Sequence, residues 1–170
     1  MNEPMSYFRT SFAFFSAHHA DPVNRAIHIV AVPCIFATAL TLLHSLLPSL
    51  WGYSAADVVA VVFALSYLAL EPLAAVLYLP VMYALHHFGT VVLGDDPATA
   101  VALQLGMWGL QTIGHAVFER SVPPLGNFAA AMHLELFFVW LEALFAVGYK
   151  PLLAMELHTS AAKRTPERGD

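Results

Sequence analysis

Residues 55–88 read AADVVAVVFALSYLALEPLAAVLYLPVMYALHHF, and this stretch decides the kind of fold that the chain can adopt. It is apolar almost throughout and much longer than the roughly 20 residues with which one helix crosses a bilayer. Glu71-Pro72 interrupts it near the middle, and proline disfavours helical backbone at the preceding residue. We therefore predict two helices, over residues 55–70 and 72–88, joined by a short turn; one long kinked helix is the alternative.

The whole chain has the composition of a membrane protein. Of its 170 residues 59% are hydrophobic and 11% are charged, and the mean hydropathy is +0.67, whereas soluble domains are about 45–50% apolar and about 25% charged. This predicts an all-α, polytopic integral membrane bundle with four or five hydrophobic helices. The net charge of −5 argues against nucleic acid as a partner. A single cysteine, Cys34, excludes a disulfide framework within the chain.

Three further apolar stretches, residues 29–50, 98–118 and 128–147, predict the remaining long helices. Asp96-Pro97 suits the start of the second stretch, because aspartate caps a helix and proline fits its first position. Pro123-Pro124 separates the second stretch from the third, and Gly148 suits the end of the third.

The two ends of the chain differ from this apolar middle. Polar and aromatic residues alternate in residues 1–28, which predicts a helix lying on the membrane surface through Tyr7, Phe8, Phe12, Phe14 and Phe15. The chain turns polar again at the other end. We expect one membrane-embedded domain over residues 1–150 and a polar tail over residues 151–170, disordered from residue 163.

The distribution of basic residues constrains the topology. Arg9 and Arg25 precede the first apolar stretch, which places the N-terminus in the cytosol by the positive-inside rule. His28 and His115 can share a site only if an even number of crossings separates them, and splitting the chain at Glu71-Pro72 gives four. A fifth crossing would place the basic residues after position 162 outside, so four and five crossings both stay open.

Nine histidines outnumber the seven lysines and arginines, and histidine is costly in a membrane unless it has a function. The first group is His19-Ala-Asp-Pro-Val-Asn-Arg-Ala-Ile-His28. Asp21 and Asn24 are residues that hydrogen-bond the local backbone and hold turns. Such a turn can aim His19 back toward His28 at a helix start; two interfacial histidines beside a helix cap are the alternative.

The second group is Gly114-His115-Ala-Val-Phe-Glu119-Arg120. His115 and Glu119 are four residues apart and share one helix face. A ligating imidazole usually needs its second ring nitrogen oriented by a carboxylate or a carbonyl. Glu119 can be that partner or a ligand itself, while an interfacial pair at a helix end is the alternative.

Together the two groups supply three imidazoles and one carboxylate, a set that suits Fe(II) or Zn(II). Three protein ligands leave coordination positions open, as catalysis requires. His86-His87 is a third possible group, with an interfacial pair at a helix end as the alternative, while His44 and His158 are expected at the interface or in the tail and His18 points away from His19. For His133, Glu135 and Glu142 in the last stretch, a proton path, a substrate contact and a buried hydrogen-bonded pair all stay open.

Three blocks of residues occur in order over roughly residues 7–151: His19-x-Asp-Pro-x-Asn-x-x-x-His28 with Val32-Pro33, then Gln111-x-x-Gly-His115-x-x-Phe-Glu119-Arg with Pro124-Leu125, then Phe137-Phe-Val-Trp-x-Glu142-x-Leu-Phe with Gly148 and Pro151. In these blocks the chain resembles the membrane 2-hydroxy-fatty-acid dioxygenase family of fungal α-oxidation enzymes. Two departures stand out. Asp21 replaces a frequent asparagine, and Glu135-Leu136 stands where the family usually has Ala-Pro.

The resemblance implies an Fe(II)-dependent enzyme that uses O2 to shorten a 2-hydroxy long-chain fatty acid by one carbon. Residues 1–150 would be its catalytic domain, and His19, His28 and His115 its metal ligands. The implied location is the endoplasmic reticulum membrane in a eukaryote, or the inner membrane in a bacterium.

Other residues support these ligands in the same hypothesis. Glu119, Asn24 and Asp21 would orient the site. Arg120 or Arg25 would pair with the substrate carboxylate. Two alternatives from other classes remain, namely a zinc-dependent membrane lipid hydrolase and a non-enzymatic membrane scaffold or transporter.

Overall fold

The computed structural model describes residues 3–120 and 128–162, and the regular structure in these ranges is helical. The seven α-helices are α1 Glu3–His18, α2 Pro22–Leu46, α3 Ala55–Leu70, α4 Pro72–His87, α5 Pro97–Gly114, α6 Phe128–Ala146 and α7 Pro151–Ala162, and two π-helical turns are η1 Phe88–Val92 and η2 His115–Glu119. The predicted all-α class is confirmed. The expectations for Pro123-Pro124, for Pro124-Leu125 and for residues 163–170 lie outside the described residues.

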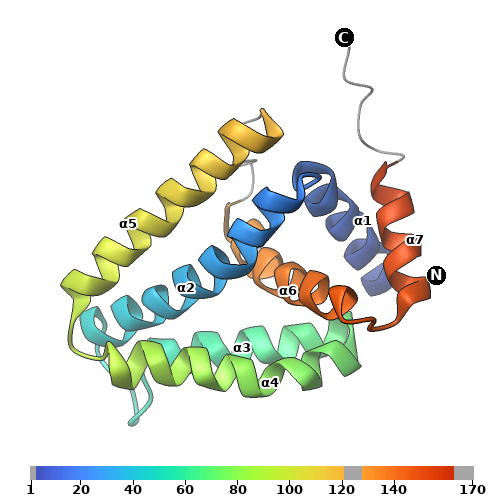
Figure 1. Cartoon of the computed structure of the whole chain (residues 1–170). Coiled ribbons are helices and arrows are strands. Elements are labelled where there is room, and N and C mark those ends of the chain that lie inside the picture. The colour runs from blue at the N-terminus through green and yellow to red at the C-terminus, as the bar shows by residue number, and fades with distance from the viewer. Residues whose placement is uncertain (1–2, 121–127, 163–170) are drawn as a thin grey trace.

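The helices are arranged so that distant parts of the chain meet (Figure 1). Helices α2 and α5 run side by side in opposite directions, and α3 and α4 form an antiparallel pair near the far end of α2. Helix α6 packs between α2 and the first helix of the chain. Helices α1 and α7 lie side by side although they come from opposite ends of the sequence.

The division at Glu71-Pro72 is confirmed. Glu71 ends α3 and begins α4, its extended backbone breaks the helix, and its carboxylate accepts a hydrogen bond from the Ala74 amide at 2.6 Å. The same carboxylate accepts hydrogen bonds from the Tyr149 hydroxyl, at 2.7 Å, and from the Lys150 ammonium group. Glu71 thus caps one helix and also ties the α3–α4 turn to the segment between α6 and α7.

Local signals set most other helix ends. Asp21 caps α2, so this helix begins at Pro22. The helix ends at Leu46, and both of its ends therefore come earlier than those of the predicted stretch 29–50. Asp96 caps α5 at Pro97 as predicted. Helix α6 ends at Ala146, and Gly148 with φ +90° follows it; the amides of Gly148 and Tyr149 donate to the carbonyls of Phe145 and Leu144, which is the Schellman pattern.

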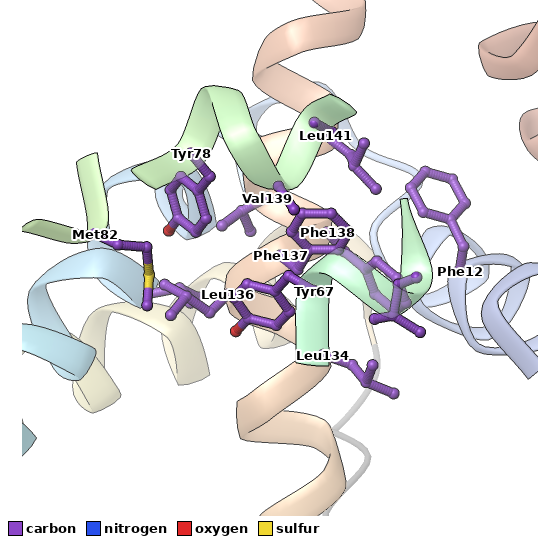
Figure 2. Close-up of a cluster of buried hydrophobic side chains, with 14 of the residues drawn as sticks. Phe12, Tyr67, Tyr78, Met82, Leu134, Leu136, Phe137, Phe138, Val139 and Leu141 are labelled. Carbon is purple, nitrogen blue, oxygen red and sulfur yellow. The ribbon is translucent and has the colours of Figure 1, made fainter. Parts of the chain in front are cut away.

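The core combines aromatic and aliphatic side chains and is centred on α6 (Figure 2). Phe137 stacks on Tyr67 of α3 with ring centroids 4.6 Å apart, and Trp140 stacks on Tyr78 of α4 at 4.9 Å. The indole of Trp140 also donates to the Ala74 carbonyl. Consecutive residues of α6 are buried because neighbours lie on several of its sides: Leu136, Phe137, Phe138 and Val139.

The expected surface position of the N-terminal aromatic residues is wrong for three of the five. Phe8, Phe12 and Phe15 are buried and face Phe138 of α6, whereas Tyr7 and Phe14 are exposed. The buried three recur at helical spacing and form one face. The stretch expected to be a polar tail begins with α7, whose Leu157 joins the same core. Helix α7 and α6 therefore cover the aromatic face that was assigned to the membrane.

Apolar side chains cover the outer faces of α3, α4, η1 and α5. The exposed ones include Val58, Val61, Val62, Leu65, Leu73, Val76, Leu77, Leu79, Val91, Val92, Val101, Leu105 and Ile113. By length and composition, two stretches within the described ranges can cross a bilayer, namely Pro22–Leu46 and the continuous Pro72–Val92. Helix α3 is apolar but shorter.

We expect Glu71→Gln to lower the free energy of unfolding near neutral pH by about 1–3 kcal/mol, because it removes the carboxylate that accepts from Lys150 and Tyr149. Burial alone raises the pKa of Glu71, but the hydrogen bonds from Lys150, Tyr149 and Ala74 outweigh it and hold the pKa below its ordinary value of 4.5. The stabilisation is therefore complete above pH 4.5 and is lost as the pH falls through the lower pKa of the folded state.

Unfolding in detergent, followed by circular dichroism from neutral to acidic pH, measures this difference. The two proteins should converge in acid, and a difference that does not change with pH would contradict the prediction. Glu156→Gln is the control, because Glu156 pairs with Arg9 at an exposed position and such pairs contribute only about 0–1 kcal/mol.

Candidate metal centre

Three imidazoles meet where α1 ends, α2 begins and α5 passes into η2. The ring centroids of His19 and His28 are 4.3 Å apart, and the ring of His115 lies 4.9 Å from the first and 5.0 Å from the second. One ligand atom from each residue lies within 4.8 Å of the other two, and all three side chains are buried. The three histidines that the sequence singled out therefore form one cluster, which can hold a metal ion.

Short-range hydrogen bonds hold two of the rings. Nδ1 of His19 lies 2.8 Å from the Phe15 carbonyl, and Nδ1 of His28 lies 2.8 Å from the Asn24 carbonyl. A carbonyl only accepts, so in both residues Nδ1 carries the proton and Nε2 presents a lone pair. The ring of His19 also stacks on Phe15, with centroids 4.1 Å apart.

The ring nitrogens that remain are available to a ligand. Within the described residues, buried Nε2 of His19 and buried Nδ1 of His115 have no hydrogen-bond partner. Burial, followed by the nearby His28, lowers the pKa of His19 from 6.5 to about 2, so this imidazole is neutral at physiological pH. Buried nitrogens without a partner are rare, and neutral imidazole is the form that binds metals. The donor set fits a divalent ion such as Fe(II) or Zn(II).

Glu119 acts on the turn that carries two of these histidines. Its Oε1 accepts from the backbone amide of Asp21 at 2.8 Å and from the side-chain amide of Asn24 at 3.2 Å. The Asp21 carboxylate in turn accepts from the Val23 and Asn24 amides. Glu119 therefore connects η2 to the His19–His28 turn. Its carboxylate also acts on His115, whose pKa burial lowers and the nearby Glu119 raises.

A glycine allows this approach. A Cβ atom on Gly114 would lie 2.5 Å from Oδ1 of Asn24 and 3.3 Å from Cδ1 of Ile27. Helix α5 can therefore lie against the first turns of α2 only without a side chain at this position. The backbone then widens into the π-helical turn η2, which begins at His115; such turns are frequent at functional sites.

The two candidate arginines differ in their surroundings. Arg25 lies 3.5 Å from the buried carboxylate of Glu142, which also contacts Nε2 of His158 at 2.9 Å. Arg120 is exposed and has a left-handed backbone at the end of η2. Arg25 thus already has a carboxylate partner within the protein, whereas Arg120 projects from the end of the segment that carries His115.

Sequence reasoning missed the position of Glu135. Its Oε1 lies 3.6 Å from Nε2 of His19 and 3.7 Å from Nε2 of His28. The sequence placed this residue in the last apolar stretch without a role. A carboxylate inside an apolar run was the available signal, but it could not indicate which helices lie opposite.

Four of the other histidines contact residues outside the cluster. His86 contacts Asp57 at 2.8 Å, and His133 contacts the Ser66 hydroxyl at 2.5 Å and stacks on Tyr67. His18 contacts the Phe14 carbonyl, and His87 stacks on Tyr83.

The fold and the cluster define a class, namely helical proteins with apolar outer faces that hold three buried imidazoles where their helices meet. The family model described as 2-hydroxy-palmitic acid dioxygenase Mpo1-like matches residues 5–147. The chain is also similar to 2-hydroxy-palmitic acid dioxygenase MPO1 of Saccharomyces cerevisiae, with 30% identity over 166 residues that cover 92% of this chain and 91% of that protein. No solved structure matches. The chain belongs to the Mpo1-like family, and the resemblance seen in the sequence is confirmed.

We expect Gly114→Ala to displace the Asn24 side chain and to lower the free energy of unfolding by about 1–3 kcal/mol, because the new methyl group overlaps Oδ1 of Asn24. Gly109→Ala, on the same helix, is the matched control. Its Cβ would meet nothing within 4 Å, so it should be neutral or stabilising by up to about 1 kcal/mol. Thermal unfolding of the two variants compares them, and equal midpoints would contradict the prediction.

We expect Glu119→Ala to loosen the His19–His28 turn, because the Asp21 amide and the Asn24 side chain lose their acceptor. Leaving these donors unpaired should cost about 1–3 kcal/mol. Hydrogen exchange read by mass spectrometry should accelerate in a peptide that covers Asp21, while peptides of α3 and α4 stay unchanged. Glu119→Gln keeps an acceptor oxygen and should show a smaller effect; unchanged exchange in both variants would argue against the connection.

Proposed function

We propose that this chain is a membrane-embedded Fe(II)-dependent dioxygenase that shortens a 2-hydroxy long-chain fatty acid by one carbon. The observation that carries this proposal is the buried convergence of His19, His28 and His115 in a chain of the Mpo1-like family. The relative MPO1 carries the name of a 2-hydroxy-palmitic acid dioxygenase. The proposed balance is one 2-hydroxy acid and one O2 giving the shorter acid, carbon dioxide and water, so no external reductant is needed.

The protein's own part is to hold and orient the reactants. His19, His28 and His115 would hold Fe(II), with the Phe15 and Asn24 carbonyls keeping two of the rings in the ligating tautomer. Bound Fe(II) would supply the site at which O2 is activated and the two oxygens of a 2-hydroxy acid are bound. Glu119, Asn24 and Asp21 would keep the ligands in register through the hydrogen bonds that cross from η2 to the turn.

We assign the substrate carboxylate to Arg120 rather than to Arg25. Arg25 lies beside Glu142, which already compensates its charge. Arg120 is exposed and follows η2 directly, five residues after His115 in the sequence. A guanidinium group pairs with a carboxylate through two parallel hydrogen bonds, which would fix the orientation of the acid.

We also propose that the chain resides in a membrane, with four or five hydrophobic segments crossing it and residues 1–150 as the catalytic unit. The apolar outer faces of α3, α4 and α5 support this location, because a soluble monomer rarely exposes so much contiguous apolar surface. Four helices, α2 to α5, separate His28 from His115. Four crossings return the chain to the same side of the bilayer, as one shared site requires.

Anaerobic purification in detergent followed by an assay with Fe(II), O2 and 2-hydroxypalmitate tests the function. We expect one bound iron per chain and an acid one carbon shorter, with His115→Ala reducing the product by at least about 100-fold, because a ligand is lost. His86→Ala is the matched control, because His86 pairs with Asp57 away from the cluster. Bound zinc with no O2 consumption and no shortened acid would favour the lipid hydrolase, and absence of metal would reject both enzymes.

A further inference from the structure

We propose that Glu135 is a fourth, anionic ligand of the ion held by the three histidines in the substrate-free protein. The inference rests on the proposed function, because it takes the histidine cluster as the metal site. It would turn a set of three neutral nitrogens into a set of three nitrogens and one carboxylate oxygen. Glu135 comes from α6, so this ligand would join a fourth element to the site.

The spacing of Glu135 is that of ligands that share an ion. Its Oε1 lies 3.6 Å from Nε2 of His19 and 3.7 Å from Nε2 of His28. Both separations exceed the usual range of a hydrogen bond. Two ligands bound at about 2.1 Å to one ion stand about 3.0–3.4 Å apart, from the octahedral to the tetrahedral angle. The carboxylate oxygen is therefore nearly equidistant from the two lone pairs, and only slightly farther away than a common ion would bring it.

Within residues 3–120 and 128–162, Glu135 has no lysine or arginine partner. Its side chain is 18% exposed, and its ion-pair contacts there are with the two imidazoles. Glu142, on the same helix, contrasts with it, because Arg25 and His158 contact its carboxylate. A mostly buried carboxylate without a cation is costly. A divalent ion among the imidazoles would supply the missing positive charge.

The apolar neighbours of Glu135 hold it in place. Leu134, Leu136, Phe137 and Phe138 are buried on the other sides of α6. Rotating α6 to release the carboxylate would expose these side chains, so the core keeps Glu135 directed at the cluster. A 2-hydroxy acid also offers a carboxylate. We therefore assign Glu135 to the substrate-free site, where it occupies a position that the substrate carboxylate can take over.

Titration of the metal-free protein in detergent with Co(II) tests the proposal through affinity and through the visible d–d bands, which report coordination number. Glu135→Gln should weaken Co(II) binding by at least about 10-fold and shift the bands. Glu142→Gln, the matched control, should behave like the wild type. Glu135→Asp keeps the charge but shortens the side chain, so its affinity for Co(II) should lie between those of Glu135→Gln and the wild type. This variant replaces Glu135→Gln in the test if the latter does not fold.

The outcomes separate this inference from the proposed function. If Glu135→Gln and Glu135→Asp bind Co(II) with wild-type affinity and bands while His115→Ala binds none, Glu135 is no ligand and the histidine site stands. If the wild type binds neither Co(II) nor Fe(II), the metal site and the proposal on Glu135 both fail. Circular dichroism of each variant verifies that its helices are intact.

Discussion

The surrounding structure depends on three neutral imidazoles that are buried together, because each of their ring nitrogens needs a partner and three helix ends must meet to supply them. A buried ring nitrogen needs a partner, and the chain provides one for Nδ1 of His19 and of His28 through the carbonyls of Phe15 and Asn24. Each of these carbonyls is four residues before its histidine, so helix geometry itself aims the rings. The three rings converge, with centroids 4.3, 4.9 and 5.0 Å apart. The end of α1, the start of α2 and the end of α5 must meet there.

The contact between α2 and α5 carries this convergence. Gly114 lets the helices approach, and Glu119 connects η2 to the turn at Asp21 and Asn24. A substitution at Gly114 or Glu119 is therefore expected to disturb the positions of all three histidines. Two of these histidines come from one end of the chain and the third from position 115. The α3–α4 turn is held separately, because the Glu71 carboxylate accepts hydrogen bonds from Tyr149 and Lys150 in the segment between α6 and α7.

Two kinds of apolar surface have separate roles in this fold. The aromatic face of α1 and the residues of α6 are buried together, with Phe12 against Phe138 at 5.3 Å between ring centroids. The apolar side chains on the outer faces of α3, α4 and α5 are exposed. Hydrophobicity alone does not distinguish these surfaces, because both obey the same helical period. The difference depends on which helices lie alongside, and α7 is one of those that cover α1.

The helix ends at Glu71-Pro72, Asp96-Pro97 and Gly148 could be predicted from the sequence, because proline, capping carboxylates and glycine act within a few residues of themselves. The three histidines could be predicted too, because their spacing and the resemblance of the surrounding blocks are properties of the chain. Tertiary structure alone decided that Glu119 holds a turn, that Phe8, Phe12 and Phe15 face inward, and that Glu135 faces His19 and His28. These contacts join segments far apart in sequence, so they depend on the angle and register at which whole helices pack, which local residue preferences do not specify.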